Sequence, residues 1–359
     1  MSTTAPSLWF HSRRYDLVWY AAVPALLMAA LFALSHALGP KGPIIAYMAS
    51  ATLTGLPHNW ITWLLILPEK SRAYYGRGTL FVPFVATAIA LIPTVLLFGT
   101  PLFAWALTLN ISLAYYHITR QHQGLLHSCD GRYIQATGDT GVRPYSRDLR
   151  WLVGAFAAVC LAWKATGGPM QLGLGIKPMT FTLAPVPIAL PLVLSAVCAF
   201  LAGRFAWNTW RRARAGKPFA KGHALIGGVA IAILGLAALV PNDQFYLTLA
   251  MVACTHNMQY FAFCYTHHHL RATADPVPND TFTRWARARR WAPWFLVPIG
   301  LGVAFAGVCA LLPPALYAFA LNWFMTSHYF VDANIWRRKY YPTMGRFASG
   351  RVEPVPVGA

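Results

Sequence analysis

The sequence predicts an all-α integral membrane protein, a polytopic bundle of about ten transmembrane helices built as a single transmembrane domain over residues 1–359. Hydrophobic residues make up 57% of the 359 positions and charged residues only 11%, whereas a soluble domain carries about 25% charged residues. Apolar runs of about 20 residues, the length a helix needs to cross a bilayer, recur along the whole chain. Together these observations exclude an ordinary soluble fold.

Ten apolar runs of spanning length can be placed along the sequence. Short turns around Gly99, Val240 and Leu312 separate three neighbouring pairs of runs, which predicts helical hairpins. Membrane lipids are expected to surround the resulting bundle. The expected spans cover residues 17–38, 44–67, 79–98, 101–119, 150–166, 184–204, 222–240, 244–266, 292–312 and 315–335.

The basic residues predict how the bundle is oriented. Arg13 and Arg14 precede the first span, and basic runs follow the second, fourth, sixth, eighth and tenth spans, whereas the opposite loops offer only Lys41, Lys164 and Lys177. Because cytoplasmic loops carry the excess of Lys and Arg, both termini are expected in the cytoplasm, as in a bacterial inner membrane protein. Polar cytoplasmic loops are expected at about 128–149, 205–221 and 270–290.

The formal net charge of +19 would also suit a protein that binds nucleic acid. The charges, however, sit in short runs between apolar segments, as expected for loops that face an anionic leaflet, so no nucleic acid is expected as a partner. The six cysteines show no paired spacing, and most fall inside apolar segments. We therefore expect reduced cysteines that serve packing, without a disulfide framework or a CxxC metal site.

Histidines gather toward the cytoplasmic ends of the second, fourth, eighth and tenth predicted spans. Because all four spans are even-numbered, these ends face the same leaflet. Histidines that served only helix packing would scatter over both leaflets, so their sidedness predicts a shared site. The polar residues in question are His58, His117, His122, His127, His256, His267, His268, His269, His328 and Asp332.

Such a site is suited to a metal ion, because neutral imidazole is the commonest protein ligand for iron, copper and zinc. His328 and Asp332 are four residues apart and share a helix face, so Asp332 can ligate the metal or orient His328. We predict that His256, His328 and Asp332 are catalytic. The predicted metal ligands are His117, His122, His256, His267, His268, His328 and Asp332. A second tier of contributing residues consists of His58, His127, His269, Tyr260 and Gln259.

At these residues the chain resembles the membrane-embedded histidine-box oxidases, the fatty-acid desaturases, hydroxylases and alkane monooxygenases. His117-xxxx-His122 has the spacing of a first box, and Cys264-Tyr265-Thr266-His267-His268 has the shape of an HxxHH box with cysteine in the leading position. No complete HxxHH occurs, and His328-Tyr329-xx-Asp332 replaces the third box. The resemblance implies two non-haem irons, O₂ as co-substrate and a lipid-like substrate.

A second likeness involves the second span. Gly55-Leu56-Pro57-His58 is similar to the Gly-x-Pro-His element of the bacterial carotene-cleaving oxygenases, which are polytopic proteins with few iron-binding histidines. Both likenesses imply non-haem iron and an apolar substrate, but they differ on whether the site holds one iron or two.

The pattern favours an oxidoreductase that uses O₂ on a lipid, isoprenoid or other apolar substrate entering from the bilayer. Electrons would come from a separate protein, because the sequence shows no flavin, nicotinamide or Fe–S motif. The basic loops at 204–221 and 271–290 would dock an acidic electron carrier at the cytoplasmic face, although such loops also serve simply to set topology.

Two other functions are considered. A metal ion or proton transporter would use His58, His256 and His328 as a relay, but the outer halves of the spans are almost entirely apolar. A haem-binding electron-transfer protein would use an axial pair such as His58 and His256, but the histidines outnumber two axial ligands.

Overall fold

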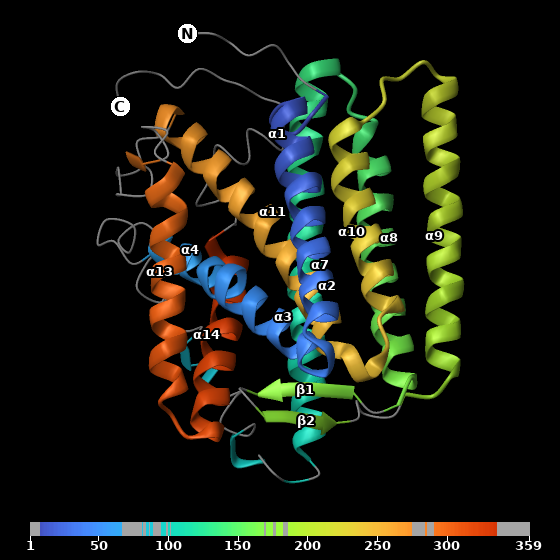
Figure 1. Ribbon diagram of the computed structural model, residues 1–359. Coiled ribbons are helices and arrows are strands. Elements are labelled where there is room, and N and C mark those ends of the chain that lie inside the picture. The colour runs from blue at the N-terminus through green and yellow to red at the C-terminus, as the bar shows by residue number, and fades with distance from the viewer. Residues whose placement is uncertain are drawn as a thin grey trace.

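The computed structural model describes residues 8–66, 81, 84–85, 87–88, 95–97, 100, 102–168, 170–174, 177–181, 186–274, 284–285 and 291–335. Its elements are helices apart from one antiparallel pair, β1 (Met170–Leu174) and β2 (Lys177–Phe181). Figure 1 shows the two strands lying across one end of a bundle of long helices.

Short turns join several of the described helices, including α7 to α8 and α9 to α10. η1 and η3 are π-helical turns, and η2 and η4 are 3₁₀ turns. In chain order the described helices are α1 (Arg13–Leu17), η1 (Val18–Ala22), α2 (Val23–Ala37), η2 (Gly39–Lys41), α3 (Gly42–Ser50), η3 (Ala51–Gly55), α4 (Leu56–Ile66), α7 (Phe103–Thr137), α8 (Val142–Thr166), α9 (Ala189–Arg214), α10 (Lys221–Leu239), η4 (Asn242–Gln244), α11 (Phe245–Ala274), α13 (Trp291–Ala310) and α14 (Pro314–Ile335).

Five described helices are long and apolar enough to cross a membrane, namely Arg13–Ala37, Val142–Thr166, Ala189–Arg214, Lys221–Leu239 and Ala292–Ala310. These helices are compatible with a membrane protein, and the larger number of about ten spans stays a prediction. The predicted spans that become α7, α11 and α14 are helical but are not among these five, because they carry the polar residues. The predicted span at 79–98 falls mostly outside the described residues.

The segments predicted as polar cytoplasmic loops at 128–149 and 205–221 are largely helical, and their location in the cytoplasm stays a prediction. Within 128–149, α7 continues to Gly138, whose left-handed φ of 69° ends the helix while its N–H donates to the carbonyl of Ile134 at 2.7 Å. α8 begins only four residues later, and Val142 and Tyr145 pack with Ile134 in a small separate core. Because charged residues interrupt the apolar positions of this segment, its helical periodicity is weak in the sequence.

The loop predicted at 205–221 is also shorter, since α9 continues to Arg214 and α10 begins at Lys221. Likewise, α11 continues to Ala274, and most of the remaining predicted loop at 270–290 lies outside the described residues. In each case the helix extends past the apolar run because basic residues are good helix formers.

The bundle has two distinct ends. One end, called the basic end, is formed by α1, the last turns of α7 and α9 and the first turns of α8 and α10 (Figure 1). The other, called the strand end, holds β1, β2 and η4, with β1 in contact with α11 and η4. Basic residues at the basic end include Arg13, Arg14, Arg132, Arg143, Arg147, Arg150, Arg211, Arg212, Arg214, Lys217 and Lys221.

The centre of the bundle is occupied by α11, which crosses it obliquely in Figure 1. It packs against α2, α3, α7 and α10, whereas α9 packs chiefly against α8 at the edge. α14 packs against α4 and α7, and α4 also contacts α11. The four helices that carry the predicted site residues, α4, α7, α11 and α14, therefore border a common interior.

The π-helical turn η3 sets the position of α4. It directly precedes the dipeptide Leu56-Pro57, where proline removes one backbone donor from the helix. The Thr54 hydroxyl donates to the carbonyl of Ser50 at 2.7 Å and accepts from the Asn257 amide of α11 at 3.0 Å. Extra residues inserted as π turns re-aim the side chains that follow. Here η3 sets the direction in which the side chain of His58, the third residue of α4, points.

α13 holds α4 from the other side through a close approach at Gly302. A Cβ atom at Gly302 would lie 3.0 Å from Cδ of Pro57 and 3.1 Å from Cβ of Leu56. At Gly307, on the same helix, no described atom lies within 4 Å of such a Cβ. A side chain would therefore be crowded at the first position and not at the second.

We predict that Gly302→Ala destabilises the protein by about 1–3 kcal/mol, because the added methyl group overpacks the contact with α4. Gly307→Ala is the matched control and should be stabilising by about 0.5–1 kcal/mol, since alanine favours the helix. Thermal unfolding in detergent, followed by circular dichroism, measures both effects. Equal midpoints for the two variants would show that α13 and α4 do not approach as described.

Candidate metal centre

Three imidazoles and one carboxylate meet inside the bundle. His58 comes from α4, His117 from α7, and His328 and Asp332 from α14. One donor atom from each residue lies within 4.8 Å of every other, and all four residues are buried, with exposed fractions of 1%, 8%, 2% and 5%. This His/Asp cluster could hold a metal ion, and it joins residues up to 274 positions apart in the sequence.

Two of the imidazoles face each other directly. Nε2 of His58 lies 3.1 Å from Nε2 of His328. Their ring centroids are 4.8 Å apart, with the planes nearly perpendicular at 86°. The ring of His117 lies 4.9 Å from that of His328. Two ring nitrogens that face each other in this way can share a proton or serve the same cation.

The carboxylate of Asp332 is held by two hydroxyl groups. Tyr260 donates to Oδ1 at 2.8 Å, and Thr62 donates to the same atom at 3.0 Å. The other carboxylate oxygen, Oδ2, lies 4.0 Å from Nε2 of His117. One oxygen is thereby fixed while the second faces the imidazoles, an outer-shell arrangement typical of metal ligands.

His256 and His122 lie beside the cluster. The ring of His256 is 4.9 Å from that of His58 and 5.1 Å from that of His117, and the ring of His122 is 6.4 Å from that of His256. Neither residue belongs to the tight group of four. α7 runs without a break through both of its histidines, so His117 and His122 diverge around the helix.

Buried ring nitrogens without partners distinguish this region. Within the described residues, no hydrogen-bond partner reaches Nε2 of His117 or Nδ1 of His58, His122 or His256. An unsatisfied buried polar atom costs about 1–3 kcal/mol, so four such atoms approach the net stability of a whole domain, about 5–15 kcal/mol. A bound ion and water are the usual explanation for such atoms.

The remaining predicted residues are placed as follows. His267, His268 and His269 lie on α11, but their side chains fall outside the described part of the structure. Tyr260 contacts the cluster through Asp332, with its ring 4.2 Å from that of His58. Gln259 donates to the carbonyl of Tyr20 on η1, away from the four residues.

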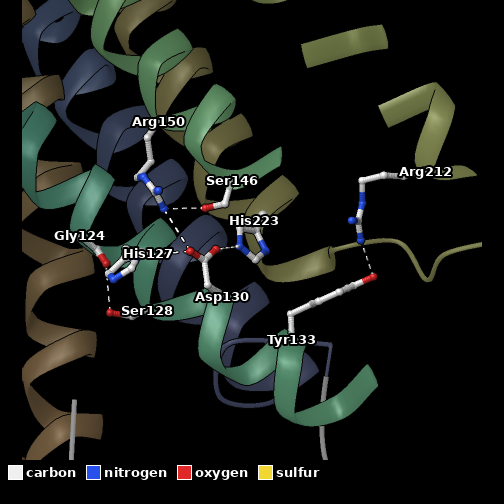
Figure 2. Close-up of polar contacts among 9 residues, drawn as sticks. All are labelled: Gly124, His127, Ser128, Asp130, Tyr133, Ser146, Arg150, Arg212 and His223. Atoms are coloured by element: carbon white, nitrogen blue, oxygen red, sulfur yellow. Dashed lines mark hydrogen bonds and ion pairs between the residues drawn. The ribbon is translucent and has the colours of Figure 1, made fainter. Parts of the chain in front are cut away.

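His127 belongs to a different polar network at the basic end, shown in Figure 2. It lies 3.2 Å from Asp130, whose carboxylate also accepts from His223 at 2.8 Å and from Arg150 at 3.2 Å. Arg150 in turn donates to Ser146 at 2.8 Å. This network joins α7, α8 and α10, and a second-tier role for His127 at the metal centre has no support in this geometry.

The pKa of Asp130 reflects this surrounding. Burial alone would raise the pKa of the carboxyl group, but the hydrogen bonds from His127, His223 and Ser146 and the charge of His223 outweigh burial and hold it below its ordinary value. The carboxylate is therefore ionised at neutral pH and neutralises Arg150. Its role is to fasten three helices together at the basic end.

A cavity of about 130 Å³ adjoins the cluster. His58, His117, His256 and His328 form part of its wall. Most of the other lining residues are apolar or small, including Gly55, Ile111, Ala114, Leu249, Val252, Ala253 and Met325. The cluster thus borders a space suited to a small apolar group.

His58 was predicted only as a second-tier residue, and no role was predicted for Thr62 or Asn59. Thr62 follows His58 by four residues and so shares its helix face, which was the available signal. Asp130 was likewise missed as the partner of His127, although the spacing of three residues places both on adjacent turns. The residues of other helices that Thr62 and Asp130 contact could not be predicted, because they depend on how the helices cross.

No protein-family model matches the chain, and searches of curated proteins and of solved structures also find no match.

We predict that His117→Ala and His328→Ala each weaken metal affinity by more than about 100-fold, because outer-shell partners alone contribute about 10–100-fold. Tyr260→Phe should cost about tenfold, since Asp332 keeps the hydrogen bond from Thr62. Metal titration of detergent-purified protein measures the affinity. The control is His36→Ala, on an exposed position of α2. If all four variants bind metal equally, the cluster does not hold it.

At the basic end, Asp130→Asn should destabilise the protein by about 3 kcal/mol, because it leaves a buried ion pair without its anion. The lowered pKa means that the carboxylate stabilises fully above about pH 4, and that this stabilisation is lost as pH falls further toward the folded-state pKa. The variant should therefore lose less stability than wild type below about pH 4. Unfolding midpoints against pH test this, with the exposed Asp243→Asn as control. Parallel curves would contradict it.

Proposed function

We propose that this protein is a membrane-embedded oxidoreductase that holds non-haem iron and uses O₂ to oxidise an apolar substrate drawn from the bilayer. The observation that carries the proposal is the buried cluster of His58, His117, His328 and Asp332 beside an apolar cavity. The five helices able to cross a membrane are consistent with a substrate that arrives through lipid.

The donor set supports a transition metal. Three imidazoles suit iron, copper or zinc rather than the oxygen-seeking Ca²⁺ or Mg²⁺, and the described cluster offers no thiolate. Nitrogen ligands at about 2.1 Å place opposite donors about 4.2 Å apart. The widest pair here, at 4.8 Å, would have to close by only about 0.6 Å. Side-chain rotation alone covers such a distance.

Iron bound here would supply the one-electron chemistry that reaction with O₂ requires. The protein's own residues have separate tasks. His58, His117 and His328 offer neutral donors, and Asp332 supplies the negative charge that offsets part of the metal's charge. Tyr260 and Thr62 hold the carboxylate in place by donating hydrogen bonds to Oδ1 of Asp332.

Bulk water is kept away from the cluster by the packing around it. Trp63, Phe261 and Phe324 are buried in the main apolar core together with Tyr260. A dry site protects reactive species from side reactions and strengthens electrostatic interactions within it. This packing favours chemistry on an apolar molecule over hydrolysis.

A single iron is favoured over two, because only one tight group of donors occurs among the described residues. A second ion near His122 and His256 would need further ligands from α11. His267 and His268 are the ligands predicted there from the sequence. Those side chains lie outside the described residues. The proposal therefore takes His256 as an additional donor to one ion.

The two alternative functions fit the cavity less well. A haem is far larger than a space of about 130 Å³, which is close to the cavity of about 150 Å³ that holds a benzene molecule. A transport path would need a continuous line of polar residues on both sides of the relay, whereas Ile111, Leu249 and Val252 make much of the cavity wall apolar. We propose that the basic end faces the cytoplasm of a bacterial cell, where an acidic electron carrier docks.

Metal analysis of the purified, detergent-solubilised protein, combined with its optical spectrum, tests the proposal. We expect about one iron per chain, as one group of donors would bind, and no Soret absorption. A Soret band would indicate haem, and stoichiometric zinc or the absence of metal would contradict an iron oxidoreductase. Iron-loaded protein should also consume O₂ when a lipid extract and a chemical reductant are added.

A further inference from the structure

The cavity beside the cluster is elongated along α7 and α11. On α7 its wall runs from His117 back to Asn110, and on α11 it runs from His256 back to Leu249. Seven residues along a helix correspond to about 10 Å. Both helices begin at the strand end, so the cavity extends from the cluster toward the strand end (Figure 1). The histidines of the cluster line its other end.

Its size restricts what can enter. A volume of about 130 Å³ is slightly less than that of a cavity of about 150 Å³ that holds benzene. Small side chains, among them Gly55, Ala114 and Ala253, line the wall and leave this space open. A space about 10 Å long with this volume admits a single chain of roughly six or seven carbons and no fused ring system.

One polar side chain in the wall is not accounted for by packing. Asn59 is 1% exposed and follows the cluster residue His58 directly on α4. Within the described residues its amide nitrogen, Nδ2, has no hydrogen-bond partner. The comparable side chain Asn257, which follows His256, donates instead to Thr54. Asn59 therefore offers an unused donor at the cluster end of the cavity.

We infer that this cavity is the substrate subsite, and that it takes the end of a slender apolar chain bearing an oxygen that accepts a hydrogen bond from Asn59. The inference rests on the proposed metal site and adds to it the class of substrate: an aliphatic chain with a carbonyl or ether oxygen near the carbon to be oxidised. A purely hydrocarbon chain would leave the buried amide donor unsatisfied.

The test uses protein in lipid nanodiscs with Co²⁺ bound in place of iron, because cobalt absorption responds to changes beside the metal. Heptane and 2-heptanone are the two probes, compared at equal mole fraction in the bilayer so that partitioning cancels. We expect 2-heptanone to perturb the spectrum at about fivefold lower mole fraction, the effect of one net hydrogen bond. Asn59→Leu should remove this preference while leaving cobalt bound.

A second variant tests the cavity independently of Asn59. Ala253→Phe fills the space and should abolish the response to both probes without loss of cobalt. Leu109→Phe, at a position of α7 that is 61% exposed, is the matched control and should respond as wild type does.

The outcomes separate the two proposals. If cobalt does not bind, the proposed metal site fails and the subsite fails with it. If cobalt binds and neither probe changes its spectrum, the subsite is wrong although the metal site stands. If Asn59→Leu keeps the preference for 2-heptanone, the assigned role of Asn59 is wrong.

Discussion

Desolvation of imidazole is the constraint on which the centre of this bundle depends. Uncompensated burial of polar groups costs several kcal/mol each in an apolar surrounding, yet His58, His117 and His328 of the cluster and the adjacent His256 are all buried. Such residues are tolerated only where they satisfy one another or share an ion. Of the helices that carry them, α7, α11 and α14 are not among the five described helices that are long and apolar enough to cross a membrane, and α4 packs against α13, which is one of those five.

Two groups of buried polar residues lie at different levels along the bundle axis, and they have different roles. The inner layer, around Asp332, has a carboxylate held by two hydroxyls and surrounded by neutral imidazoles. The outer layer, around Asp130 at the basic end, pairs its carboxylate with Arg150 and with histidines (Figure 2). Charge pairing in the outer layer holds the helices together. The described cluster of the inner layer contains no lysine or arginine, and its side chains can donate electron pairs to a cation.

The sequence predicted the parts that follow from periodicity and sidedness. Helices occur at nine of the ten predicted spans within the described residues, and the even-numbered spans do bring His58, His117, His256 and His328 together. The sequence could not predict which residues face one another, because this depends on the π turn at η3 and on the close approach at Gly302. The helical segment after His127 was missed because its charges concealed the pattern.

X-ray absorption at the edge of the bound metal measures the central claim most directly, because it reports the ligands themselves. We expect a first shell of nitrogen and oxygen atoms at about 2.1 Å, with the outer-shell scattering of at least three imidazoles and a reduced imidazole contribution in His58→Ala. A sulfur shell, the scattering of a porphyrin, or a spectrum unchanged by His58→Ala would contradict a metal centre built from His58, His117, His328 and Asp332.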